Sequence, residues 1–70
     1  MHELRTYQIE LRGQVDEKDL NIMSPLEMAL VRVDTAATLF RIRTDQSGLI
    51  GLVRHLHSRG FVLFSIIRER

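Results

Sequence analysis

The chain has no cysteine and no long apolar run, and each absence excludes a class of protein. Without cysteine there is no disulfide framework and no thiolate metal site, so nothing points to an oxidising compartment. The longest apolar run, Phe61–Ile67, includes Ser65 and is far shorter than the roughly 20 residues that span a membrane. The N-terminus lacks the apolar core of a signal peptide. We therefore expect a cytoplasmic protein without a membrane segment.

Size and charge set further bounds. Seventy residues make one small domain, residues 1–70, in which a single core only just offsets the entropy of the chain. Ten basic and nine acidic side chains leave a net charge of +1, which argues against nucleic acid as the partner. Nine of the ten basic residues are arginines, which suit stacking and contacts with carboxylates or phosphates.

The last third of the chain carries the clearest local signals. Asp45 is a helix cap, and Gly60 can adopt the positive φ that ends a helix. The apolar residues between them recur at the three-and-four spacing of a helix: Leu49, Leu52, Val53 and Leu56. The run Phe61–Ile67 follows directly as a strand. This helix must fold back on a sheet that contains its own following strand, which is typical of an α+β protein.

Strand patterns fill most of the remaining chain. Thr6–Arg12 alternates between apolar and polar residues, as in a half-buried strand. Asp16–Leu20 can form one or two turns of helix. Leu26–Ile42 reads as a hairpin with its loop at Asp34–Ala37. Pairing Val33 with Thr38 across that loop also sets Val31 opposite Phe40 on the inner face.

The resulting order is strand, short helix, strand, strand, helix, strand. It predicts a ferredoxin-like β-α-β-β-α-β sandwich with a stunted first helix and a four-stranded antiparallel sheet. The sheet order in that topology is 4-1-3-2, with the first and third strands in the middle. A different antiparallel sheet carrying a single helix is the alternative architecture.

Three segments resemble parts of a group of small bacterial proteins of unknown function. Tyr7–Glu17 is similar to their opening strand, glycine and acidic step. Asp45–Val53 and Gly60–Ile66 are similar to their closing helix, glycine stop and strand. The chain departs from the group at Lys18-Asp19-Leu20, where the relatives carry tryptophans. The resemblance implies the ferredoxin-like fold, and it implies no activity.

The chemistry-bearing residues form no recognisable site. His55 and His57 lie two apart, so on a helix they point in nearly opposite directions and cannot chelate one metal ion. No serine lies in a nucleophile elbow, and no Ser-His-Asp spacing is legible. The sequence therefore predicts no catalytic residue, no metal and no cofactor.

A surplus of apolar residues predicts an interface. In the expected register five of them fall on the sheet face away from the helix: Met28, Leu30, Leu39, Leu63 and Ile67. Contiguous exposed apolar surface usually marks an interaction site. The last strand is also apolar on both faces, although the fold places it at an edge with unpaired backbone groups. We expect a homodimer, formed edge to edge or back to back. A slipped register or a swapped C-terminus would instead hide these residues within one chain.

Three function classes follow from this pattern. The first is a non-catalytic interaction or regulatory module, acting as a homodimer that holds a protein partner or small ligand at its sheet face. The second is a small dimeric enzyme with a pocket between helix and sheet, using Tyr7, His55 and Arg41. The third is a weak nucleic-acid binder with contacts from Arg12, Arg41 and Arg43. The lack of convergent polar residues on the inner face favours the first.

Overall fold

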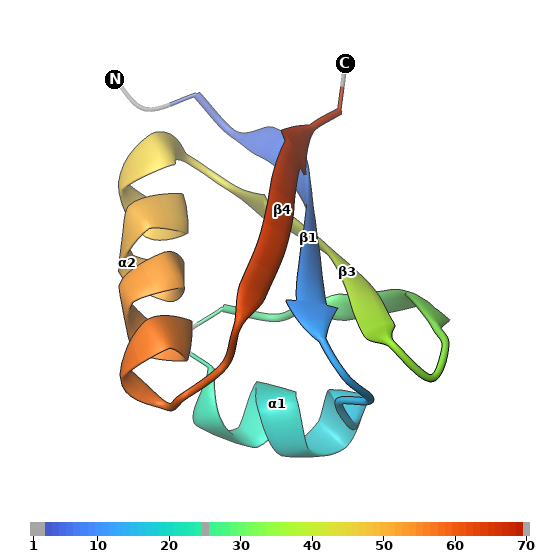
Figure 1. Cartoon of the computed structure of the whole chain (residues 1–70). Coiled ribbons are helices and arrows are strands. Elements are labelled where there is room, and N and C mark those ends of the chain that lie inside the picture. The colour runs from blue at the N-terminus through green and yellow to red at the C-terminus, as the bar shows by residue number, and fades with distance from the viewer. Residues whose placement is uncertain (1–2, 25, 70) are drawn as a thin grey trace.

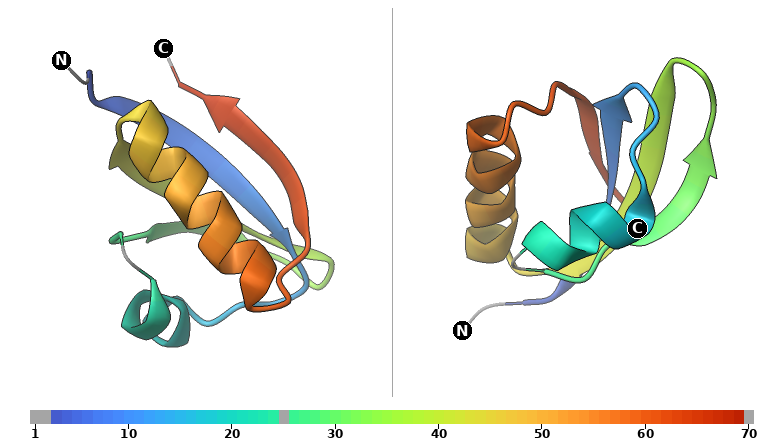
Figure 2. Two further views of the ribbon diagram at one scale, coloured as in Figure 1. Left: turned by 90° about the vertical axis from the view of Figure 1, so that its left-hand side faces the viewer. Right: turned by 90° about the horizontal axis from the view of Figure 1, so that it is seen from below.

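In the computed structural model, which describes residues 3–24 and 26–69, two helices accompany a single four-stranded antiparallel sheet (Figure 1). The elements are β1 (Arg5–Arg12), α1 (Glu17–Met23), β2 (Ala29–Val33), β3 (Ala37–Thr44), α2 (Gln46–Ser58) and β4 (Leu63–Arg68). The strands lie in the order β2-β3-β1-β4. This confirms the predicted α+β class and the ferredoxin-like arrangement, with β1 and β3 in the middle of the sheet. The helices lie on one side of the sheet, with α2 along it and the short α1 near one end (Figures 1 and 2).

Both helices begin directly after a capping aspartate, of which Asp45 was predicted. Asp45 Oδ1 accepts a hydrogen bond from Gly48 N at 2.7 Å, and Asp16 Oδ1 accepts one from Lys18 N at 2.9 Å. These bonds satisfy amides that have no partner inside the helix. Gly60 has a φ of +87°, so it turns the chain out of α2 as expected. The cap at Asp45 and the glycine stop at Gly60 therefore lie at the predicted ends of α2.

The core lies between α2, α1 and one face of the sheet. Nine apolar side chains are buried there: Tyr7, Ile9, Leu11, Leu20, Met28, Phe40, Ile42, Leu52 and Leu56. The members from β1 and β3 alternate with polar residues that face away from the helices. One face of the sheet is thus apolar and covered, and we call the opposite one the outer face.

A bulge in β2 changes the predicted register. Val33 pairs with Thr38 as expected, but the pairing shifts so that Leu30, and not Val31, lies opposite Phe40. Because one extra residue reverses the alternation before it, Leu30 turns to the helix side. Met28, two residues earlier, is fully buried in the core. The expectation that Met28 and Leu30 lie on the outer face is therefore wrong.

A second bulge has the same effect in β4. Ile66 lies opposite Ile9 and Ile67 opposite Gln8, as the alternation predicts. The register then shifts, and Leu63 lies opposite Leu11 and packs against the core. The predicted placement of Leu63 on the outer face is therefore wrong as well. The residue patterns of β2 and β4 give no indication of either bulge.

Two polar side chains fix the connections at one end of the sheet. Thr38 is fully buried, and its Oγ1 donates to Gly13 O at 2.7 Å and accepts from Val15 N at 2.9 Å. It thereby ties the β1–α1 connection to β3. Asp34 Oδ1 accepts from the amides of Ala36 and Ala37, both at 2.8 Å, and closes the β2–β3 hairpin at the predicted loop. These backbone hydrogen bonds lower the pKa of Asp34 below its ordinary value.

Candidate interaction surface at the sheet edge

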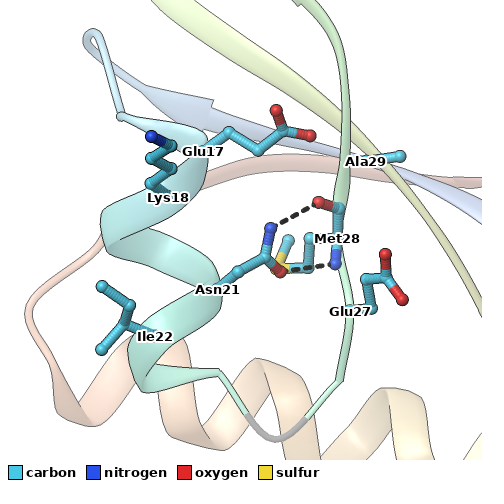
Figure 3. Close-up of a pocket in the computed structure, with 7 residues that line it drawn as sticks. All are labelled: Glu17, Lys18, Asn21, Ile22, Glu27, Met28 and Ala29. Atoms are coloured by element: carbon cyan, nitrogen blue, oxygen red, sulfur yellow. Dashed lines mark hydrogen bonds between the residues drawn. The ribbon is translucent and has the colours of Figure 1, made fainter.

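The edge of the sheet at β2 is covered by side chains of α1. Asn21 Nδ2 donates to Met28 O at 2.9 Å, and Asn21 Oδ1 accepts from Met28 N at 2.7 Å (Figure 3). The side-chain amide therefore occupies the place that a neighbouring strand would take. Glu17 Oε2 accepts from Leu30 N at 2.8 Å and covers the next outward amide along the strand. Covering an edge in this way is a recognised protection against pairing with another chain.

An open depression of about 600 Å³ lies beside this covered edge. Its lining comes from α1 and the start of β2: Glu17, Lys18, Asn21, Ile22, Glu27, Met28 and Ala29 (Figure 3). The depression mixes acidic, basic and apolar groups. Two of its polar side chains, Glu17 and Asn21, are already bonded to backbone of the same chain. We therefore read it as part of the edge cover and not as a ligand site.

The opposite edge, at β4, is open. Glu69 N donates to Thr6 O at 2.8 Å, so Glu69 turns its backbone groups toward β1. Because these groups alternate along an antiparallel ladder, Ser65 and Ile67 also face β1, whereas Ile66 and Arg68 face away. In residues 3–24 and 26–69 no side chain bonds to the outward groups of Ile66 or Arg68. This edge is ready to accept another strand.

Apolar side chains cluster around the open edge. Those with large exposed fractions are Val62 at 47%, Phe64 at 52%, Ile66 at 38% and Ile67 at 58%. Ile66 is exposed although it lies on the helix side, because α2 runs over the middle of the sheet and leaves β4 beside it (Figure 2, left). An apolar groove of about 440 Å³ lies between Val53 and Leu56 of α2 and the segment Phe61–Leu63 that leads into β4. The β4 edge therefore combines free backbone groups with uncovered apolar surface.

The exposure of Phe64 and Ile66 escaped the sequence interpretation, which placed both on a covered inner face. A helix with its side chains is about 10 Å wide, and strands lie about 4.8 Å apart. A single long helix can therefore cover only about two strands of four. That limit was available from the predicted elements alone, and it identifies the edge strands as the uncovered ones.

The outer face is polar and internally paired. Arg41 Nε donates to Glu69 Oε2 at 2.7 Å, and Gln8 Nε2 donates to the same oxygen at 3.1 Å. Both bonds lower the pKa of Glu69 below its ordinary value, with Arg41 the larger cause. Arg12 and Arg43 lie on this face too and are exposed. The three predicted anion contacts therefore share one face, with Arg41 already bound to a carboxylate.

The five predicted interface residues divide between the two faces. Leu39, opposite Glu10, and Ile67, opposite Gln8, lie on the outer face as expected. The other three lie on the helix side, as described above: Met28, Leu30 and Leu63. The outer face consequently holds too little apolar surface to favour back-to-back packing. The exposed apolar side chains lie along the two edge strands, on β2 at Leu30, Val31 and Val33 and around β4 at Val62, Phe64, Ile66 and Ile67.

The residues suggested for an enzyme do not converge. Tyr7 is buried on the helix side opposite Ile42, whereas Arg41 points to the outer face. His55 lies on α2, and its Nε2 is buried without a hydrogen-bond partner among the described residues. Within residues 3–24 and 26–69 no group of three or more metal-binding side chains comes together. No described helix is long and apolar enough to cross a membrane.

Comparison with protein-family models, curated proteins and solved structures gave no significant match. The resemblance to a group of small bacterial proteins therefore stays a prediction, and the geometry of the β4 edge carries the functional argument.

Proposed function

We propose that this chain is a small non-catalytic interaction module that works as a homodimer joined through its sheet. The difference between the two edges carries the proposal. At β2, Asn21 bonds to the N–H and C=O of Met28, and Glu17 accepts from the N–H of Leu30. At β4 no side chain of the described residues covers the outward groups of Ile66 and Arg68 in this way. Both edge strands carry exposed apolar side chains, so the uncovered backbone is what distinguishes β4 as the edge for association.

The exposed apolar area supports association at this edge. Full burial of an isoleucine or phenylalanine side chain contributes about 1.5–3 kcal/mol. Phe64, Ile66 and Ile67 are each 38–58% exposed, so covering one of them adds about 1 kcal/mol per subunit. A two-fold interface counts each contribution twice. For a domain with only 70 residues, this is a large gain relative to its own stability.

Light scattering on the wild type and two matched variants tests the proposal. Phe64→Arg places a charge at the β4 edge, and Val33→Arg places the same charge at a site of similar exposure on β2. We expect a wild-type dimer, a monomeric but folded Phe64→Arg variant and a dimeric Val33→Arg variant. A wild type that stays monomeric throughout the micromolar range would overturn the proposal. So would dissociation of both variants alike, since the β4 edge would then have no special role.

The shared face of Arg12, Arg41 and Arg43 supports a second candidate, binding of nucleic acid through the outer face. Arg41 is engaged by Glu69, and the two central strands, β1 and β3, place no aromatic side chain on the outer face for bases to stack on. Titration of an oligonucleotide at two salt concentrations tests this candidate. Binding that weakens with salt, and weakens further in Arg43→Gln, would favour it.

A further inference from the structure

We infer that two copies join by pairing β4 with the partner's β4 in antiparallel fashion, about a two-fold axis at Ile66. The inference rests on the proposed homodimer and specifies its contact. It continues the sheet of one subunit into that of the other, which gives eight strands. The second copy is the occupant that the open edge fits, because its own β4 offers the same free backbone groups and the same apolar side chains.

The backbone limits the registers that such a pair can adopt. Ile66 and Arg68 present their N–H and C=O groups at the free edge, whereas the backbone groups of Ser65 and Ile67 face β1. In a two-fold antiparallel pair, an outward residue must face another outward residue. The axis therefore passes through a residue position, and the candidates within the regular ladder are Ser65, Ile66, Ile67 and Arg68.

The side chains then select among these positions. An axis at Arg68 would set two arginines of like charge opposite each other, which is destabilising. An axis at Ser65 would form both of its central hydrogen-bonded pairs through Phe64, where the bulge distorts the ladder, whereas an axis at Ile66 keeps its central pair within the regular ladder. An axis at Ile67 would shift Phe64 past the partner's Arg68, the last residue of its β4, and leave the ring in solvent.

An axis at Ile66 avoids these conflicts at the centre of the pair. Ile66 faces the partner's Ile66, so two side chains that are each 38% exposed on the helix side cover one another. Phe64 then lies opposite the partner's Arg68, and the guanidinium can rest on the exposed ring. The same pair forms again on the other side of the axis. The register thus joins apolar with apolar and cation with aromatic, and no like charges meet.

Single cysteines test the register directly, because the wild-type chain contains none and any disulfide must join two copies. The set is Ser65→Cys, Ile66→Cys and Ile67→Cys, with Val33→Cys on the β2 edge as control. Directly opposite residues of an antiparallel pair lie about 4.5–5.5 Å apart at Cα, which a disulfide can bridge. Under mild oxidation we expect Ile66→Cys to form the covalent dimer at least about tenfold faster than the control and faster than either neighbour. Faster cross-linking at another position would overturn the register.

Proline supplies a second, independent test. Ile66→Pro removes an amide that points away from β1, so the fold tolerates it while the pairing with a second β4 does not. Ile66→Thr shortens the side chain and keeps the amide. We expect the proline variant to be a folded monomer and the threonine variant to remain a dimer. If the wild type is a dimer, but Ile66→Pro dimerises equally well and no β4 cysteine cross-links faster than the control, the strand pairing is wrong and the homodimer stands. A monomeric wild type would refute both.

Discussion

Thr38 offers the sharpest test of how the first connection is held. The side chain is fully buried, and its hydroxyl donates to Gly13 O and accepts from Val15 N. Thr38→Val keeps the shape of the side chain and removes both hydrogen bonds. The carbonyl of Gly13 and the amide of Val15 then lose their partner at the point where the chain leaves β1 for α1.

The magnitude follows from these two groups. A buried polar group left without a partner costs about 1–3 kcal/mol. Gly13 and Val15 are only half-buried, so water can reach them in part and the lower half of that range applies. We expect Thr38→Val to lower the free energy of unfolding by about 2–4 kcal/mol, which in a domain of this size lowers Tm by at least about 10 °C.

Urea denaturation at one fixed, low protein concentration measures this loss, because the proposed dimerisation would make apparent stability depend on concentration. Thr38→Ser is the matched control: it keeps the hydroxyl, loses one methyl group and is expected to cost only about 1 kcal/mol. If the valine variant proves as stable as the wild type, or more stable than the serine variant, then the hydroxyl does not hold the connection and the reasoning fails.

The other two predictions concern the covered edge and the outer face. Asn21→Ala removes both hydrogen bonds to Met28 and should lower the free energy of unfolding, measured in urea, by about 1–2 kcal/mol. Lys18→Ala on the same helix is the control and should change it by less than about 0.5 kcal/mol. Equal effects of the two substitutions would contradict the role of Asn21 in covering the β2 edge. Because Arg41 and Gln8 lower the pKa of Glu69, its contribution to stability is complete above the unfolded-state pKa, about 4.3, and is lost as pH falls through the lower folded-state value. The stability difference between wild type and Glu69→Gln should therefore shrink as the solution is acidified below about pH 4.3 at low salt, and a difference independent of pH would count against the ion pair.

Local signals in the sequence were enough to predict the fold. The two ends of α2 were predictable from Asp45 and Gly60, because capping and a positive φ depend on one residue and its immediate neighbours. The strict alternation of β1 placed Tyr7, Ile9 and Leu11 in the core. The order of elements then left few topologies open, and the sheet has the expected order.

The sheet face on which each side chain of the edge strands β2 and β4 lies could not be predicted in the same way. A bulge near Val31 and another near Phe64 each reverse the alternation, and they depend on how the edge strand meets its neighbour and not on the strand's own residues. Met28, Leu30 and Leu63 were misplaced for this reason. The role of Asn21 was equally hidden, since an exposed-looking amide on a short helix gives no sign that it will bond to a backbone seven residues later.

The cover that α1 places on β2 has a consequence for the size of any assembly. If two copies join at β4 as proposed, the continuous sheet ends on both sides in a β2 strand whose outward groups at Met28 and Leu30 N–H are covered by Asn21 and Glu17 of its own subunit. We therefore expect α1 to obstruct the addition of further copies at β2. A subunit whose α1 came loose would expose a second reactive edge, and the same strand pairing that makes a finite dimer could then propagate into an open-ended filament.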